Sequence, residues 1–322
     1  MNPPVISIVM PVYNGRKYLR LAIDSVLAQE FQDYELIIWN DCSTDESLEI
    51  INAYNDPRIK AFSSHRNGGL FKAINLGIQS SSAPLIRLWC QDDVMKPDCL
   101  ATEVDFHSRF PEVGLGFSLY DVIDQKGVVI IPATASNHPS VLSKELANQL
   151  MFYHGSIPGN ISNVVLKRSV LENVGLFRED LVIAGDFEMW VRIAGHYPLG
   201  YINKPLIFVR GHAGQLSNQT DSYVISMREE EPLYEILTNR LPASLQSYAR
   251  SYDLLHRYPM YLHHAVSRLA SADVPNARGA YEMFSHSGHR LLVFLFWLLT
   301  ANQRLYSLKP KYAGNCVEHQ NS

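Results

Sequence analysis

The first 90 residues alternate short apolar runs with amphipathic segments, and this alternation constrains the fold more than any other feature. Runs at 6–12, 34–39, 59–62 and 85–90 have the length and composition of β-strands. Between them, apolar residues recur at helical spacing over 18–27, 48–53 and 70–78. Strands that alternate with helices of this length predict an α/β fold, in which helices cover both faces of a mostly parallel sheet.

Polar side chains follow the predicted strands at their carboxyl ends, which is where sheets of this class bind ligands. They are Asn14, Asp41, Asn67 and Asp92. The last belongs to Gln91-Asp92-Asp93, where two adjacent carboxylates repel each other and a bound cation would offset their charge. An acidic pair alone is equally consistent with a solvated turn, so the residues that accompany it decide its meaning.

The rest of the chain is less regular. Residues 114–132 predict an edge strand and 158–167 a further strand-like piece. Ser43-Thr44-Asp45-Glu46 matches a capping box that would open the second helix, and Trp190 on a helix over 187–194 is predicted to be a core residue. A polar loop over 211–220 precedes a helical segment. We therefore expect an α/β domain at 1–220 and a helical region at 221–322.

Composition and charge exclude several classes of protein. A net charge of −4 with scattered basic residues argues against nucleic-acid binding. The four cysteines lack zinc spacing and a dense disulfide pattern, and the N-terminus lacks the features of a signal peptide, so we expect a cytoplasmic protein. The apolar run at 291–299 is too short to span a bilayer of about 30 Å. It predicts a helix that is buried or lies peripherally on the inner face of the membrane.

Five ordered motifs together resemble family 2 of the inverting glycosyltransferases, which have the GT-A nucleotide-sugar fold. The motifs are Val9-Met10-Pro11-Val12-Tyr13-Asn14, Asn40-Asp41-Cys42-Ser43-Thr44-Asp45, Asn67-Gly68-Gly69 with Asn75, Gln91-Asp92-Asp93, and Gly185-Asp186-Phe187-Glu188-Met189-Trp190. The resemblance covers about residues 6–217. It implies a GT-A fold, with the helical region as a C-terminal appendage.

The resemblance also implies a role for each site residue. The nucleotide of the sugar donor would be held by Pro11, Tyr13, Asn14, Asp41, Asn67 and Asp92. Asp93 would ligate Mg²⁺ or Mn²⁺, and His212 would complete the metal shell. Asp186 would be the catalytic base that removes a proton from the acceptor hydroxyl, which gives a product inverted at the anomeric carbon. The chain departs from the family pattern at Asn40 and Gly185, where acids are usual.

These roles imply a metal-dependent inverting glycosyltransferase that moves a sugar, foremost from a UDP-sugar, to a hydroxyl acceptor. The acceptor would be a glycan, a lipid-linked sugar or another hydroxyl acceptor such as a protein, foremost in cell-envelope or surface polysaccharide synthesis. One alternative is a sugar nucleotidyltransferase, although the segment 11–16 lacks the glycine-rich phosphate loop of that class. A second is a catalytically impaired nucleotide-sugar binding module. This alternative remains because position 185 is Gly where the family usually has an acid.

Overall fold

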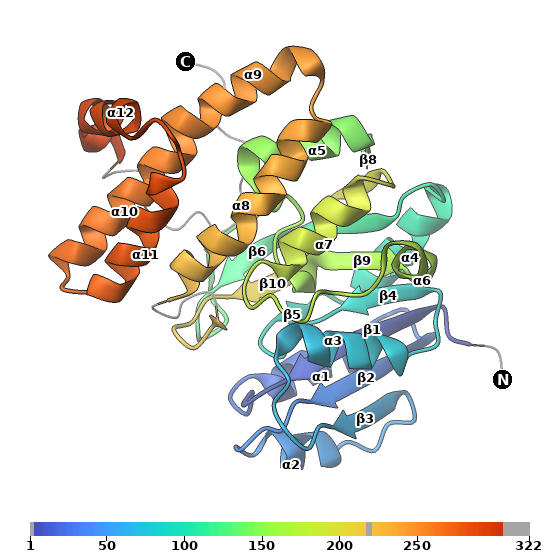
Figure 1. The fold of residues 1–322 in the computed structure, drawn as a ribbon. Coiled ribbons are helices and arrows are strands. Elements are labelled where there is room, and N and C mark those ends of the chain that lie inside the picture. Colours follow the sequence, from blue (N-terminus) through green and yellow to red (C-terminus); the bar gives the residue numbers. More distant parts are fainter. Residues whose placement is uncertain (1–2, 217–220, 305–322) are drawn as a thin grey trace. The chain divides into compact units, whose positions relative to one another are not determined.

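The computed structural model describes residues 3–216 and 221–304 (Figure 1). These residues divide into two compact units, of which the first ends at His212 and the second begins at Ala213. The expected domain boundary after residue 220 adjoins residues 217–220, which lie outside the described part of the chain, as do 305–322. Each unit has its own hydrophobic core and is described separately.

A mixed sheet of ten strands forms the centre of the first unit. The strands are β1 (Ile6–Val12), β2 (Tyr34–Asn40), β3 (Ile59–Ser63), β4 (Leu85–Leu88), β5 (Val94–Met95), β6 (Leu115–Ile123), β7 (Val129–Ile131), β8 (Val141–Leu142), β9 (Val164–Lys167) and β10 (Leu199–Arg210). Their order is β3-β2-β1-β4-β9-β6-β10-β5, with β7 beside β6 and β8 beside β10.

Strand direction brings the carboxyl ends of the main strands to one edge of this sheet. Strands β1 to β4 are mutually parallel, and β9 runs antiparallel to both β4 and β6. Because β10 is parallel to β6, both end at the same edge as β1, β2 and β4. Chain segments that lie more than a hundred residues apart in the sequence therefore meet at this edge.

Helices cover both faces of the sheet, as the alternation predicts (Figure 1). They are α1 (Leu19–Leu27), α2 (Ser47–Asn52), α3 (Leu70–Gln79), α4 (Cys99–Arg109), α5 (Lys144–His154), α6 (Arg168–Val174) and α7 (Gly185–Ala194), with a 3₁₀ turn η1 (Ile161–Asn163). Ile8 and Met10 of β1 share a core cluster with Ile23 of α1. Val9 points to the opposite face, where it packs against Gly77 of α3. The predicted α/β class is confirmed.

Two local predictions are wrong. The strand expected at an edge, β6, lies inside the sheet between β9 and β10, and its alternation is obscured because residues on both of its faces are buried. The capping-box pattern does not cap α2, which begins only at Ser47. Instead the Ser43 hydroxyl accepts from the Asn14 N–H at 3.0 Å, and Asp45 accepts from the Arg16 N–H at 3.0 Å. These polar groups connect two neighbouring loops.

The second unit is helical, as expected for the C-terminal appendage. It contains α8 (Ser222–Arg240), α9 (Ala243–Tyr252), a π-helical turn (Asp253–Arg257), α10 (Tyr258–Ala270), α11 (Val274–Ser285) and α12 (Arg290–Arg304). Its core joins Val224 and Met227 of α8 to Tyr261 of α10, Phe284 of α11 and Val293 of α12. No helix in the described part of the chain is both long and apolar enough to cross a membrane.

Candidate functional site

Asp41 follows β2 directly, and its carboxylate holds the start of α3. It accepts from the backbone N–H of Gly68 at 2.9 Å and from that of Gly69 at 2.9 Å, and the residue is 3% exposed. Gly69 has φ 90°, a backbone conformation that residues with a side chain rarely adopt. The Asn67 side chain accepts from the same Gly69 N–H at 3.0 Å. Because a carboxylate offers about four lone pairs, Asp41 can still accept from a ligand.

Two hydrogen bonds join the loop after β1 to the loop after β4. The Tyr13 N–H donates to Gln91 Oε1 at 2.9 Å, and Gln91 Nε2 donates to the Tyr13 carbonyl at 3.0 Å. Asn14 has φ 50°, and its Oδ1 accepts from the Thr44 N–H at 2.8 Å. The Tyr13 residue is 46% exposed, whereas Pro11 is buried within β1. Asn14 therefore joins two loops, and both Asn14 and Tyr13 are exposed.

The two acids of Gln91-Asp92-Asp93 lie in different environments. Asp93 is 2% exposed, and its Oδ1 accepts from the Arg210 N–H at 2.8 Å. The Asp92 side chain is 19% exposed, and its Oδ2 lies 2.8 Å from His212 Nε2. Burial, and secondly the charge of Asp92, raise the pKa of Asp93 to about 8. A second negative charge is thus disfavoured beside Asp92, and a bound cation would offset it.

The strand end of β10 completes this acidic cluster. Arg210 Nε donates to the Asp92 carbonyl at 2.9 Å, and its guanidinium lies 4.6 Å from the centre of the Tyr18 ring. The His212 ring lies 5.2 Å from the same tyrosine ring. Sequence reasoning selected His212 as a metal ligand and placed the segment Arg210-Gly211-His212 near the diphosphate, but it gave Tyr18 no role at the site. The sequence does not indicate a site role for Tyr18, because this residue fits the apolar spacing of the helix α1 that follows it.

The donor set at this edge fits a hard divalent cation. Ligand atoms of Cys90, Asp92 and Asp93 lie within 4.8 Å of one another. Burial raises the pKa of the Cys90 thiol well above its ordinary value, so the protonated thiol is a poor ligand. Carboxylate oxygens are the ligands that Mg²⁺ and Mn²⁺ prefer, and the imidazole of His212 contacts one of them. Asp92 and Asp93 are therefore the residues suited to hold such an ion.

Ser162 supports the buried acid from the 3₁₀ turn η1. Its hydroxyl lowers the pKa of Asp93 against the larger effect of burial, and its Oγ accepts from the Cys90 N–H at 3.0 Å. Sequence reasoning missed Ser162, because nothing in its surroundings distinguishes it from other serines of the chain. Its role depends on β9 inserting beside β4, which places η1 next to the end of β4.

Asp186 lies half-buried in the first turn of α7, where its Oδ1 accepts from the Phe187 N–H at 2.6 Å. The preceding Gly185 packs against Phe71 of α3, and a Cβ at position 185 would lie 2.5 Å from the Phe71 ring. This contact explains the missing acid at position 185. Phe71 lies in the first turn of α3, next to Gly69, whose N–H donates to Asp41. Asp186 therefore lies at the same edge of the sheet as Asp41.

The sequence-predicted residues thus form connected groups in the first unit. Asp92, Asp93 and His212 make one cluster, and Asp41 with Asn67 makes another at the start of α3. Gln91 links the first cluster to the loop of Tyr13 and Asn14. The contact between Phe71 and Gly185 connects Asp186 to the second cluster.

A mixed α/β sheet with acids gathered at its carboxyl edge defines a nucleotide-sugar transferase fold. The chain belongs to glycosyl transferase family 2, whose model matches residues 7–172, just over half of the sequence. An uncharacterized glycosyltransferase of Rickettsia prowazekii is 29% identical over 218 residues, which are 67% of this chain and 66% of that protein. The chondroitin synthase of Escherichia coli is 27% identical over 203 residues, which are 62% of this chain and 28% of that protein. The chain thus spans less than two thirds of these relatives.

Solved structures that share the fold include two complexes with sugar nucleotides. Residues 1–349 of TarS from S. aureus, in complex with UDP-GlcNAc, superpose with a TM-score of 0.60 at 15% identity, covering 88% of this chain and 92% of that one. The mannosyltransferase PcManGT from Pyrobaculum calidifontis, in complex with GDP-Man and Mn²⁺, gives a TM-score of 0.56 at 16% identity, covering 96% and 82%. The predicted GT-A fold is confirmed.

Proposed function

We propose that this chain is a metal-dependent inverting glycosyltransferase that moves a sugar from a nucleoside-diphosphate sugar, foremost a UDP-sugar, to a hydroxyl acceptor. The observation that carries the proposal is the cluster of Asp92, Asp93 and His212 at the carboxyl edge of the sheet. Ligands of α/β sheets bind at this edge. The sugar nucleotides in the TarS and PcManGT complexes, and the Mn²⁺ of the latter, support the same chemistry.

The sugar donor would bind across the connected loops. Asp93 and Asp92, with His212 beside them, are the groups that would hold Mg²⁺ or Mn²⁺. Such an ion, when bound, offsets the charge that develops on a departing nucleoside diphosphate. The exposed Tyr13 ring offers a flat apolar surface to a base, and Asp41 offers lone pairs to base or ribose donors. Pro11 at the end of β1, with Asn14 and Asn67 in the loops, would complete the nucleotide site.

Asp186 would act on the acceptor. A carboxylate within reach of the acceptor hydroxyl removes its proton as the oxygen attacks the anomeric carbon. Attack from the face opposite the leaving diphosphate inverts that carbon. Because Phe71 fills the space beside Gly185, a single acid at this position serves as the base. The acceptor class that we propose is a glycan or lipid-linked sugar of the cell envelope.

We predict that one nucleoside diphosphate, UDP, binds the full chain only with Mn²⁺ or Mg²⁺. Calorimetry with UDP, GDP, dTDP, CDP and ADP, each with the metal and with EDTA, measures this binding. Metal-dependent binding of one diphosphate, and its release during turnover, would support transfer. Binding of none would favour the impaired module, and release of pyrophosphate from a nucleoside triphosphate and a sugar phosphate would favour the nucleotidyltransferase.

We also propose that the protein acts in the cytoplasm, in peripheral contact with the inner face of an anionic membrane through α12. Val293 of this helix is buried in the core of the second unit. The other side presents six exposed apolar residues, Leu291, Leu292, Phe294, Leu295, Leu298 and Leu299. No acid occurs between Glu282 and Glu318 in the sequence, whereas this stretch carries Arg290, Arg304, Lys309 and Lys311. An apolar helical face flanked by cations suits a bilayer with anionic headgroups.

The full chain is therefore expected to co-sediment with vesicles of phosphatidylcholine and phosphatidylglycerol, and more weakly with phosphatidylcholine alone. The triple variant Leu291→Gln, Leu295→Gln, Leu299→Gln should lose this binding, because it removes apolar area that the bilayer would bury. Val266→Gln, Leu269→Gln, Val274→Gln changes three exposed apolar residues elsewhere in the unit and serves as the control. Equal sedimentation of both variants would count against a membrane role for α12.

A further inference from the structure

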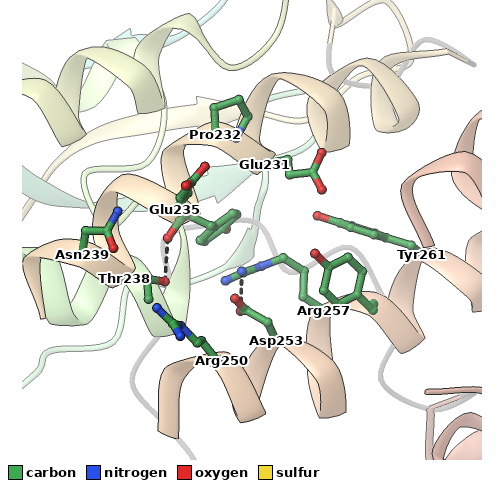
Figure 2. A pocket seen from close by; sticks show the side chains of 11 residues that line it. Glu231, Pro232, Glu235, Thr238, Asn239, Arg250, Asp253, Arg257 and Tyr261 are labelled. Carbon is green, nitrogen blue, oxygen red and sulfur yellow. Dashed lines mark hydrogen bonds and ion pairs between the residues drawn. The ribbon is translucent and has the colours of Figure 1, made fainter. Parts of the chain in front are cut away.

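A buried ion pair flanks the acidic cluster along the chain and has no part in the proposed transfer chemistry. Arg87 of β4 is 0% exposed, and its Nε lies 3.0 Å from Oε1 of Glu103 of α4, which is 1% exposed. Figure 2 shows a different kind of pair in the second unit, where Arg257 contacts Asp253 within the π-helical turn and both line a pocket. The Arg87 pair instead joins a strand to a helix inside the first unit. Because apolar residues often replace such buried pairs without loss of stability, stability alone does not account for it.

Arg87 also joins two strands at the point where their pairing ends. The paired register of β4 with β9 ends at Arg87 and Val165. Just beyond this pair, Arg87 Nη1 donates to the carbonyl of Leu88 on β4 at 2.9 Å and to that of Val164 on β9 at 3.1 Å. A guanidinium carries five N–H donors in one rigid plane, so a single side chain can serve two carbonyls and a carboxylate together. The end of β4 is therefore held at a fixed distance from η1, which immediately precedes Val164.

The same side chain connects the two ends of the segment that carries the acidic cluster. Residues 89–98 connect β4 to α4. Arg87 precedes this segment and its partner Glu103 follows it, so the ion pair ties the two ends together. The guanidinium also lies 5.4 Å from the centre of the buried ring of Trp89, the first residue of the segment. Loss of these contacts would release both ends.

Two hydrogen bonds depend on the position of this segment. The Cys90 N–H donates to Ser162 Oγ of η1 at 3.0 Å, and Asp93 Oδ1 accepts from the Arg210 N–H of β10 at 2.8 Å. The first bond joins the segment to η1, and the second joins it to the end of β10. Because Arg87 sets the distance between β4 and η1, its loss would change the geometry of both bonds and displace the Asp93 carboxylate.

We propose that Arg87 is a positioning residue for the cation site, which holds residues 89–98 so that Asp93 keeps the geometry needed to bind Mg²⁺ or Mn²⁺. Glu103 offsets the buried charge of Arg87. The proposal rests on the proposed function, because it concerns the same cation, and it adds a residue that lies outside the set of ligands. Groups that orient the ligands of a metal typically change metal affinity by about 10–100-fold when they are removed.

The test is the double variant Arg87→Met, Glu103→Leu, which removes both charges together and fills the core with apolar side chains. Its melting temperature in EDTA should stay near that of the unchanged chain. Its affinity for Mn²⁺ in the presence of UDP, measured by electron paramagnetic resonance, should fall about 10–100-fold. Hydrogen–deuterium exchange in EDTA should be about tenfold or more faster at the Cys90 and Arg210 amides, because their hydrogen bonds open locally, and unchanged in β2.

Arg87→Lys is a second variant, which keeps the charge opposite Glu103 and reports on the hydrogen bonds of the guanidinium alone. A lysine ammonium does not reproduce the planar set of donors. Metal affinity should therefore fall, and exchange at the Cys90 and Arg210 amides should become faster, as in the double variant.

The matched control is Glu35→Gln, which changes a buried acid at the opposite edge of the sheet. Glu35 lies near the start of β2, where it accepts from the Ser7 hydroxyl at 2.6 Å and pairs with Lys60 at 2.6 Å. Its loss should lower the melting temperature, because the carboxylate has these partners in the folded protein. Affinity for Mn²⁺ with UDP should stay unchanged.

Exchange is measured without metal, so it decides the role of Arg87 independently of the proposed function. Failure of the unchanged chain to bind Mn²⁺ with UDP would contradict the cation site itself. Unchanged exchange at Cys90 and Arg210 in both Arg87 variants would overturn the positioning role. An equal loss of Mn²⁺ affinity in Glu35→Gln would also overturn it, since the effect would then follow stability alone.

Discussion

Asp186→Asn is expected to lower the rate of sugar transfer by about 10²–10⁴-fold, which is the usual contribution of a positioned general base. The asparagine has the same shape but does not accept the acceptor proton. Its Oδ1 can still accept from the Phe187 N–H, so the first turn of α7 should stay intact. Binding of UDP with Mn²⁺ should be unchanged, because the donor-binding groups lie on other loops. Steady-state transfer assays and calorimetry measure the two effects.

Asp180→Asn is the matched control for this prediction. Asp180 is an exposed acid of the loop before α7, where it pairs with Arg178 at the surface. Its loss should leave both transfer and the melting temperature nearly unchanged, since exposed ion pairs contribute little to stability. Substantial residual transfer by Asp186→Asn, or equal losses in both variants, would show that Asp186 is not the base.

The sequence contains much of the information for the first unit. Apolar runs and helical spacing locate β1 to β4 and α1 to α3 within a few residues, because both periodicities arise from local burial. Asp41 follows β2 and Asp92 follows β4. Because parallel strands have their carboxyl ends at one edge of the sheet, the sequence predicts that both acids lie at this edge. Ser43-Thr44-Asp45-Glu46 shows the limit of local patterns. Ser43 accepts from the loop after β1 and does not cap α2, and Asp45 accepts both from that loop and from the Ser47 N–H at 3.0 Å.

The contacts that complete the site depend on topology, which a single sequence does not reveal. His212 meets Asp92 only because β10 runs parallel to β6 and ends at the same edge. Ser162 meets Asp93 because β9 inserts antiparallel between β4 and β6. Each contact joins residues that lie far apart in the chain.

Asp93→Asn is expected to lose metal-dependent binding of UDP by about 100-fold or more, because it removes an anionic ligand from the proposed cation site. Without metal, its melting temperature should equal or exceed that of the unchanged chain. A carboxyl group whose pKa rises from about 4 in the unfolded chain to about 8 in the folded protein costs stability increasingly as pH rises between these values. Asparagine removes that cost and keeps the acceptor for the Arg210 N–H. Calorimetry and thermal melts at pH 8 in EDTA measure both effects.

The variant Asp92→Asn distinguishes the roles of the two acids in the cluster. Asp92 is the more exposed acid and contacts His212, so its loss should weaken UDP binding while the remaining binding still requires Mn²⁺. If Asp93→Asn instead keeps its full dependence on Mn²⁺ and Asp92→Asn loses it, the ion is centred on Asp92 and His212. Asp93 would then be a buried acid that orients the end of β10 through the Arg210 N–H. The opposite pattern places the cation at Asp93, where a bound cation would offset the cost of ionising a buried carboxyl beside Asp92.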